Sequence, residues 1–462
     1  MPTISHDRTC AGCLQKQLRI DKLEEQVVAL RGKLRYQQRT AKEAPFGSST
    51  PSSKVLVKPN TLAERQALRG GGRPGHPGHG RASISAERAA RIERVSAPER
   101  CPHCNARLIL RRLRRRGIIE CDPLQVQERI LELESKQCSR CGRSVEARAP
   151  GVLPKALYGN QLLVHVATQH FLFGQTLGRV EQQTGVPTSS LWAAMHLLAK
   201  RLDPLIEELL RQYRAAPVKH ADETGWRTDG QNGYAWLFAT PTLSLFRFRQ
   251  TRSASVVREI FGSSRPRGTL VVDRYAAYNA FAGRIQYCYA HLLRALKDIA
   301  TEFPDNPEIR AFVDSLAPLL SAAIQARAMP GTDLAFRKQA KRIERGIRAC
   351  VNAPARHPAV QAFQSIFREK ADRLYHWARD RRIPADNNLA ERDLRPLVIA
   401  RKVSFGSQSI KGAHTRETLM SVLHSLKKQN RDVAACLKRA LDQLALDPKA
   451  DLFRLLFPAQ GP

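Results

Sequence analysis

The order of elements between residues 217 and 303 is the feature that most constrains how this chain can fold. Short apolar runs with strand composition alternate there with segments whose apolar residues recur at helical spacing. The pattern predicts strands over 217–222, 233–240, 243–249, 268–273 and 284–288, and helices over 253–261, 275–281 and 291–303. We therefore expect three antiparallel strands first, followed by parallel strands that helices connect and cover.

This is the ribonuclease H-like order, so we expect a mixed α/β core of that type. Asp222 ends the first strand and Asp273 ends the fourth, and these two strands would lie side by side in such a sheet. Ligand groups gather at strand ends in sheets of this kind. Two adjacent carboxylates repel each other unless a cation lies between them, and a site made only of carboxylates suits a hard cation such as Mg²⁺.

A third acid is needed to hold two ions, which together can activate the attacking oxygen and stabilise the leaving oxygen in phosphoryl transfer. Asp386, Glu391 and Asp393 are the candidates. Asn388 is a good N-cap with Glu391 in capping-box position, and Pro396 is expected to end the short helix. Glu391 and Asp393 point to different faces because they are two residues apart, so spacing alone leaves the choice open.

Two Cys-x-x-Cys pairs, Cys101 with Cys104 and Cys138 with Cys141, flank an alternating run over 126–134 that reads as a strand. One such pair can hold one side of a tetrahedral zinc ion, so the two pairs predict a structural Zn²⁺ in a zinc-ribbon-like module. Accidental pairs and a redox dithiol are the alternatives. Ten cysteines in a long chain without an export signal do not indicate a disulfide framework.

The chain is strongly basic. It has 76 Lys and Arg against 42 Asp and Glu, a formal net charge of +34. Such an excess favours a polyanionic partner, with nucleic acid the obvious one and a basic enzyme without that role the alternative. Five of the six residues from 111 to 116 are arginine, and we expect Arg112, Arg114 and Arg115 to contact phosphates rather than form a solvated face.

A helix-turn-helix outline is present between residues 176 and 202. A short helix ends at Gly185, a turn follows, and Ser189 or Ser190 is expected to cap a second helix over 191–202. Many helical hairpins share this outline. The DNA-binding interpretation places Ser189, Ser190 and Trp192 near the leading end of the second helix.

Apolar residues in the segment 14–38 recur every three and four residues, which indicates a heptad seam. The seam consists of Ile20, Leu23, Val27, Leu30 and Leu34. Two to three heptads need a partner helix to be stable, so we expect self-association here, with a helix docked on its own domain as the alternative. The pair Cys10 and Cys13 has no second pair nearby and is expected to be incidental rather than a metal site.

No apolar run of about 18 residues and no secretion signal are recognisable, so we expect a cytoplasmic protein without a membrane span that is associated with the nucleoid. The expected organisation is a coiled-coil segment over 1–40, a flexible basic linker over 41–97, the zinc-ribbon-like module over 98–150, a helix-turn-helix region over 151–214, core parts over 215–303 and 385–430 around a helical insertion over 304–384, and a helical tail over 431–462.

Four segments carry a resemblance to a known family. They are His220-Ala-Asp-Glu-Thr-Gly-Trp226, Val271-Val-Asp-Arg-Tyr-Ala-Ala-Tyr-Asn279, Cys288-Tyr-Ala-His-Leu-Leu-Arg294 and Asp386-Asn-Asn-Leu-Ala-Glu-Arg-Asp-Leu-Arg-Pro396. Together with the leucine-rich N-terminal segment, the basic linker, the paired cysteines and the helical insertion, they resemble the insertion-sequence 66 family of bacterial DDE transposases over nearly the whole chain.

The resemblance implies that Asp222, Asp273 and Glu391 are the catalytic acids and hold two Mg²⁺ or Mn²⁺ ions. It thereby selects Glu391 among the three candidates. It also places His291 near the active site, in a Cys-x-x-His motif. This chain departs from the family at one position, because Arg274 follows the second acid where the family usually has glycine. The arginine could contact a phosphate or mark an inactive copy.

The resemblance further implies a transposase that cuts strands at the terminal inverted repeats of its insertion sequence and joins them to target DNA. Arg392 and Arg395 would contact DNA near the cut, and accessory proteins of the same element are possible partners. Two alternatives remain: a nuclease of the same fold that never rejoins strands, and a decayed transposase that only binds DNA.

Overall fold

The computed structural model describes residues 16, 19–20, 22–28, 30–31, 84–122, 125–262, 266–429 and 431–458. The chain divides into two compact units. The first unit comprises Met1–Leu56, Pro217–His220 and Val257–Asn388, and the second comprises Val57–Ala216, Ala221–Val256 and Leu389–Pro462.

The expected strands and helices between 217 and 303 occur in the expected order, which confirms a mixed α/β chain. They are β5 (Val218–Thr228), β6 (Gln231–Ala239), β7 (Ser244–Arg249), α7 (Ala254–Phe261), β8 (Thr269–Val272), the 3₁₀ helix η2 (Ala276–Ala280), β9 (Arg284–Tyr287) and α8 (Tyr289–Glu302). The strand order is β7-β6-β5-β8-β9, and β5 passes from the first unit into the second between His220 and Ala221. β6 pairs antiparallel with β7, whereas β8 pairs parallel with β9 and with the first residues of β5.

The first strand does not end at Asp222, as we expected, but continues six residues further to Thr228. The reason is that Thr224 and Trp226, beyond the acid, are buried, so the strand still gains by packing there. The two residues that follow the strand, Asp229 and Gly230, both have positive φ, 53° and 71°. Two such residues form the tight turn that joins the strands of a hairpin.

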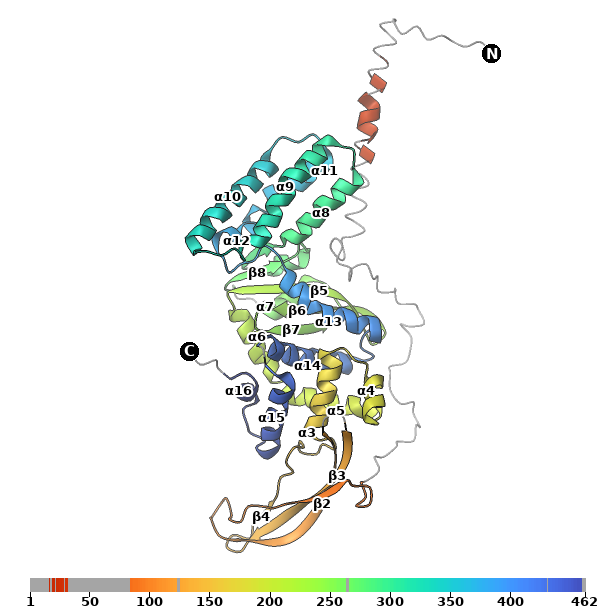
Figure 1. Cartoon of the computed structure of the whole chain (residues 1–462), viewed down its shortest axis with the longest axis vertical. Coiled ribbons are helices and arrows are strands. Elements are labelled where there is room, and N and C mark those ends of the chain that lie inside the picture. The colour runs from red at the N-terminus through yellow and green to blue at the C-terminus, as the bar shows by residue number, and fades with distance from the viewer. Residues whose placement is uncertain are drawn as a thin grey trace, which may run out of the picture. The chain divides into compact units, whose positions relative to one another are not determined.

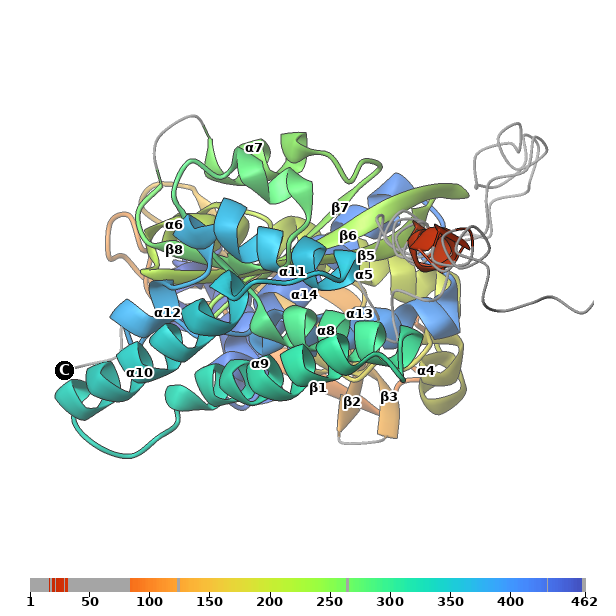
Figure 2. The same ribbon diagram turned by 90° about the horizontal axis from the view of Figure 1, so that it is seen from above.

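The first unit is mainly helical after β9. Its helices are α8, α9 (Pro307–Ala326), α10 (Asp333–Asn352), α11 (Pro358–Glu369), η3 (Ala371–Arg373) and α12 (His376–Arg379). α8, α9 and α10 lie side by side (Figures 1 and 2). Among the described helices, α9 has the length and apolar content of a membrane span. Its buried positions, such as Ile309, Leu316 and Leu320, pack within the helical group, as in the core of a bundle.

A long twisted hairpin begins the second unit. Strands β2 (Leu108–Asp122) and β3 (Gln125–Cys138) pair antiparallel, and the short strands β1 (Arg91–Val95) and β4 (Ser144–Glu146) add to β3 (Figure 1). β3 contains the strand expected over 126–134. The sequence did not predict β2, because its arginine run resembles a charged surface segment more than a strand.

The remaining helices of the second unit are α3 (Asn160–Ala167), the π helix η1 (Thr168–Leu172), α4 (Leu177–Thr184), α5 (Thr188–Leu202), α6 (Leu205–Ala215), α13 (Asn388–Ser404), α14 (Ile410–Lys428), α15 (Val433–Leu446) and α16 (Leu452–Leu456). α14 is buried along nearly its whole length and packs against both β7 and α5. It forms the centre of this unit's core.

Three expectations about helix ends were wrong. α5 begins at Thr188, whose backbone N–H and hydroxyl both donate hydrogen bonds to the carboxylate of Glu181. Neither Ser189 nor Ser190 is therefore the cap of this helix. α13 begins at Asn388, which is its first residue rather than its cap. Pro396 lies inside α13 instead of ending it. A proline removes one helical hydrogen bond, and here the buried Leu394, Leu397 and Ala400 on both sides of it outweigh that loss.

Candidate functional site

In the first unit, Asp273 directly follows β8 and is 8% exposed. Its carboxylate accepts a hydrogen bond of 2.9 Å from the backbone N–H of Tyr275, which orients the side chain at the strand end. Arg274 is exposed, and His291 lies half-buried in the first turn of α8. Asp273 therefore occupies the strand end that the sequence predicted for it.

The segment that precedes α13 is docked inside the first unit by three hydrogen bonds. The N–H of Tyr289 donates to Ala385 O (2.7 Å), and the N–H of Asn387 donates to the Cys288 sulfur (3.1 Å). His220 Nδ1 and Asn387 Oδ1 are 2.9 Å apart. Asn387 thus links the start of α8 to β5, two residues before Asp222 in sequence.

Sequence reasoning assigned no role to His220 or Asn387, although both lie in the quoted segments. For His220 a signal was present, because it stands two positions before Asp222 on a buried strand and side chains two apart share a face. His220 and Asn387 are almost fully buried, at 2% and 1% exposed, and such polar groups require a hydrogen-bond partner.

In the second unit, Asp222 lies half-buried in β5 and accepts a 3.0 Å hydrogen bond from the N–H of Glu223. Glu223 forms a buried ion pair with Arg252, whose Nε donates to Oε1 at 2.9 Å. Glu391 occupies the first turn of α13 and is half-buried. The ion pair was not foreseen, and it fixes the backbone of β5 immediately after Asp222.

The two other candidates for the third acid make structural contacts. Asp386 accepts the N–H of Asn388 at 2.9 Å and so caps α13 within the first unit. In the second unit, Asp393 accepts the hydroxyl of Ser244 at 2.9 Å and forms an ion pair with Lys428. The acids are divided between the units, with Asp273 in the first and Asp222 and Glu391 in the second. Their grouping around metal ions stays a prediction.

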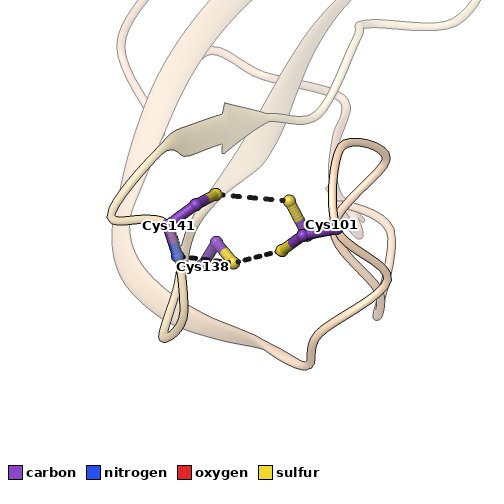
Figure 3. Close-up of side chains that lie close together, drawn as sticks. Cys101, Cys138 and Cys141 are labelled. Atoms are coloured by element: carbon purple, nitrogen blue, oxygen red, sulfur yellow. Dashed lines mark hydrogen bonds between the residues drawn. The ribbon is translucent and has the colours of Figure 1, made fainter.

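The four cysteines of the predicted zinc site come together in the second unit. Their sulfur atoms all lie within 4.8 Å of one another, with 3.3 Å between those of Cys104 and Cys138. The sulfur atoms of Cys101 and Cys141 are 3.8 Å apart (Figure 3). A tetrahedral zinc ion with Zn–S bonds of about 2.3 Å separates its sulfur ligands by about 3.8 Å. The cluster therefore has the size that a four-thiolate zinc site requires.

The two Cys-x-x-Cys turns have the same backbone. The N–H of Asn105 donates to Cys101 O (2.8 Å), and that of Gly142 donates to Cys138 O (3.0 Å). Both residues have positive φ, 57° and 66°. The backbone N–H of Cys141 lies 3.4 Å from the Cys138 sulfur and lowers the pKa of that thiol to about 6. Four cysteine sulfurs are a ligand set that structural zinc sites use, so the chemistry of the donor set also fits zinc.

The arginine run lies on β2, where residues 111–115 are exposed. Arg114 and Arg115 form exposed ion pairs with Glu146 and Glu132, whereas Arg112 forms no ion pair with any residue that the structure describes. Arg116 is different, because its guanidinium donates to Leu153 O and Ala156 O at 2.7 and 2.9 Å. It anchors the hairpin to the following segment.

In the helix-turn-helix region, Ser189 is exposed and Ser190 half-buried at the start of α5. Trp192 packs inward: its ring stacks on His196 at 5.6 Å and meets His170 edge-on at 5.5 Å. Trp192 therefore helps hold α5 in the second unit. On α13, Arg392 and Arg395 are exposed.

Four of the five predicted heptad residues are described, and they are helical and exposed: Ile20 (46%), Leu23 (51%), Val27 (42%) and Leu30 (64%). A coiled-coil helix without its partner exposes apolar side chains along one seam in this way. Leu34, the Cys10 and Cys13 pair and most of the basic linker lie outside the described residues.

Comparison with known proteins gives one family and two relatives. The model of the family described as "Transposase IS66 family" matches residues 155–415. A protein of Sinorhizobium fredii, described as uncharacterized protein y4qI, is 26% identical over 358 residues, which cover 68% of this chain and 65% of the relative. Uncharacterized protein y4jD of the same organism is 23% identical over 350 residues, 66% of this chain and 67% of the relative. The chain thus spans about two thirds of the length of these curated relatives.

Proposed function

The chain belongs to the IS66 family of transposases, since the family match covers more than half of its 462 residues, and we propose that it cuts and rejoins DNA strands at the ends of an insertion sequence. Asp222, Asp273 and Glu391 would hold two Mg²⁺ or Mn²⁺ ions in a ribonuclease H-like core. Bound there, the ions would activate the attacking oxygen and stabilise the leaving oxygen of the phosphodiester.

The register of β5 on β8 is the observation that carries this proposal. Within the first unit, Val218 pairs with Thr269, Lys219 with Leu270, and His220 with Val271. Counting two residues further along both strands reaches Asp222 and Asp273. Two carboxylates placed at equivalent positions of neighbouring parallel strands would repel each other unless a cation lay between them.

The docking of Asn387 supports Glu391 as the third acid. Asn387 contacts His220 and Cys288 inside the first unit, and Glu391 follows it by four residues at about 1.5 Å per residue of helix. This short separation along the chain between Asn387 and Glu391 supports the choice of Glu391. The capping role of Asp386 and the ion pair of Asp393 give the other two candidates structural tasks.

Recognition of the element ends would fall to the second unit. The four-cysteine cluster would hold a structural zinc ion at the end of the β2–β3 hairpin. Arg112, Arg114 and Arg115 would contact phosphates, and the α4–α5 region would approach the terminal repeats with Ser189 and Ser190. Arg392 and Arg395 would bind DNA near the cut. Two protomers would pair through the N-terminal heptads, acting at the nucleoid in the cytoplasm.

The test is cleavage and joining of labelled element-end DNA with Mg²⁺. Wild-type protein should give a joined product, whereas Asp222→Asn, Asp273→Asn and Glu391→Gln should each abolish it, because each removes a charge that holds the ions. Asp314→Asn, the same change at an exposed acid on α9, is the matched control and should leave joining intact.

Other outcomes of this assay would support a different function for the protein. Cleavage without joining would favour a nuclease of the same fold. End-specific DNA binding without chemistry would favour a decayed transposase, for which Arg274→Gly is the informative variant, since the family usually has glycine there. Equal activity of Asp273→Asn and wild type would refute the assignment of Asp273.

A further inference from the structure

Phe405, the residue after α13, is held in a conformation that phenylalanine rarely adopts. Its φ is +57°, in the left-handed region, and its side chain is 76% exposed, the highest exposure among the large apolar residues that the structure describes. Glycine would adopt this conformation without strain. Because the exposed ring adds little buried area to offset the strain, this position points to a function outside the core.

The segment 405–407 is fixed to the hairpin of β5 and β6 within the second unit. The N–H of Ser407 donates to Arg227 O, and the N–H of Asp229 donates to Ser407 O, both at 2.9 Å. A Cβ on Gly406 would lie only 2.3 Å from Arg227 O, so the close approach requires glycine. The phenyl ring is therefore presented from a rigid backbone rather than from a loose loop.

The same segment is anchored to α13 from the other side. Arg401, in the last turn of this helix, donates to the Thr224 hydroxyl at 2.9 Å and to Gly225 O at 2.5 Å. The N–H of Phe405 donates to Arg401 O at 2.9 Å. The helix end and β5 thus fix the backbone of Phe405 together.

Beyond Asn388 at its start, the exposed residues of α13 form one face that leads to Phe405. They are Arg392, Arg395, Ile399, Lys402 and Val403. Their spacing of three or four residues puts them on one side of the helix. Three of the five are cationic, and Ile399 and Val403, which are 54% and 45% exposed, lie in the half nearer Phe405.

We propose that Phe405 is a wedge that inserts between two stacked bases of duplex DNA lying along this face of α13. The cations would hold phosphates, and apolar side chains inserted at a base step unstack it and bend the duplex. Duplex DNA fits this face better than a protein partner, because three of its five side chains are cations, which suit a row of phosphates. The proposal rests on the proposed function, since the helix that carries the face also carries Glu391.

The length of α13 sets where the wedge should act. Fourteen residues separate Glu391 from Phe405, about 21 Å of helix at 1.5 Å per residue. Duplex DNA rises about 3.4 Å per base pair. We therefore expect the unstacked step within about six base pairs of the phosphodiester that is cut.

The experiment measures base unstacking directly. Full-length protein is mixed, without added magnesium, with element-end duplexes that each carry one 2-aminopurine, a base whose fluorescence rises when it is unstacked. Wild-type protein should raise the fluorescence at one or two positions within that range. Phe405→Gly should lose the rise yet melt no lower than wild type, because glycine relieves the strain. Phe405→Trp should keep the rise, and Phe173→Ala, a change at another exposed phenylalanine, should leave it unchanged.

Three results would overturn the wedge. One is wild-type binding with no fluorescence rise at any position. Another is a rise that Phe405→Gly retains. The third is that Phe405→Gly gives the same fluorescence as wild type but has a smaller sedimentation coefficient. That result would make this face a protein interface. Because no chemistry takes place, these results are separate from a failure of the proposed function, which would appear as absence of joined product in the cleavage and joining assay.

Discussion

The contacts of Asp393 distinguish it from Asp386 and Glu391, the other candidates for the third acid, which the sequence alone does not. Its side chain is 20% exposed and pairs with Lys428, whose side chain is 14% exposed. Lys428 also donates to Thr240 O and Leu243 O, at the turn between β6 and β7. Asp393 therefore compensates a largely buried cation, a structural role that the spacing of acids in the segment 386–396 cannot indicate.

We expect Asp393→Asn to lower the free energy of unfolding by about 2–4 kcal/mol, because removing one partner of a buried pair leaves the other charge uncompensated. Urea denaturation would measure the loss. The double variant with Lys428→Met should recover part of it. Asp386→Asn, which weakens only a helix cap, should lose about 1 kcal/mol or less. Equal losses for Asp386→Asn and Asp393→Asn would contradict the role of the ion pair.

Two buried histidines predict acid sensitivity of the second unit. Burial lowers the pKa of His424 to about 4 and that of His170 to about 3, in the second case with help from the nearby Arg416 charge. Between pH 6.5 and these values the unfolded chain binds protons that the folded chain does not. Stability should therefore fall as the pH drops through this window.

Replacing His424 by Gln should reduce that loss. Gln can still donate to Phe171 O, which lies 3.1 Å from His424 Nε2, but it does not titrate. The difference in unfolding free energy between pH 7 and pH 4.5 should shrink by up to about 2–3 kcal/mol relative to wild type. Urea midpoints at the two pH values measure this, and an unchanged difference would show that His424 titrates normally in the folded chain.

At the level of elements, α14 covers the edge of β7 with a matched set of side chains. The backbone N–H groups of Ser244, Phe246 and Phe248 donate to Ser425 Oγ, Ser421 Oγ and Glu417 Oε2, at 2.9–3.1 Å. Four residues of helix rise about 6 Å and two residues of strand about 6.6 Å, so the two spacings match. The helix therefore satisfies an edge strand that would otherwise present unpaired donors.

The zinc cluster makes an element-level prediction, because the two Cys turns close one end of the β2–β3 hairpin. Cys138→Ser should reduce bound zinc from about one ion per chain towards none and lower the melting temperature, since a structural metal contributes its binding energy to folding. Elemental analysis and thermal melting measure the two effects. Cys350→Ser, at a cysteine on α10, should keep the zinc, and full zinc content in Cys138→Ser would exclude the four-thiolate site.

At the scale of the whole molecule, the exposed heptad residues predict the oligomeric state. Leu23→Glu combined with Leu30→Glu should convert a dimer to a monomer in sedimentation, because charges on the seam prevent its burial. Val28→Glu is the matched control, since Val28 is 69% exposed in the same helix but lies outside the seam. A monomeric wild type, or dissociation caused equally by Val28→Glu, would contradict the expected pairing.

The order of strands and helices from 217 to 303 was predictable because local apolar periodicity follows burial on one side of each element. The end of β5 was not, since Trp226 continues the strand by packing with Phe248, with 5.1 Å between ring centroids, a partner distant in sequence. The path of α13 through Pro396 was missed for the same kind of reason. Tertiary burial outweighed a local signal in both cases.

The sequence by itself determined the family, the element order and the residue types of the candidate sites, because these depend on local pattern and motif spacing. Only the tertiary structure decided that Asp393 pairs with Lys428 and that Asn387 contacts His220 and Cys288. It alone revealed Phe405 as strained and exposed. These features depend on contacts between segments far apart in the chain, and such contacts leave no periodic mark on the sequence.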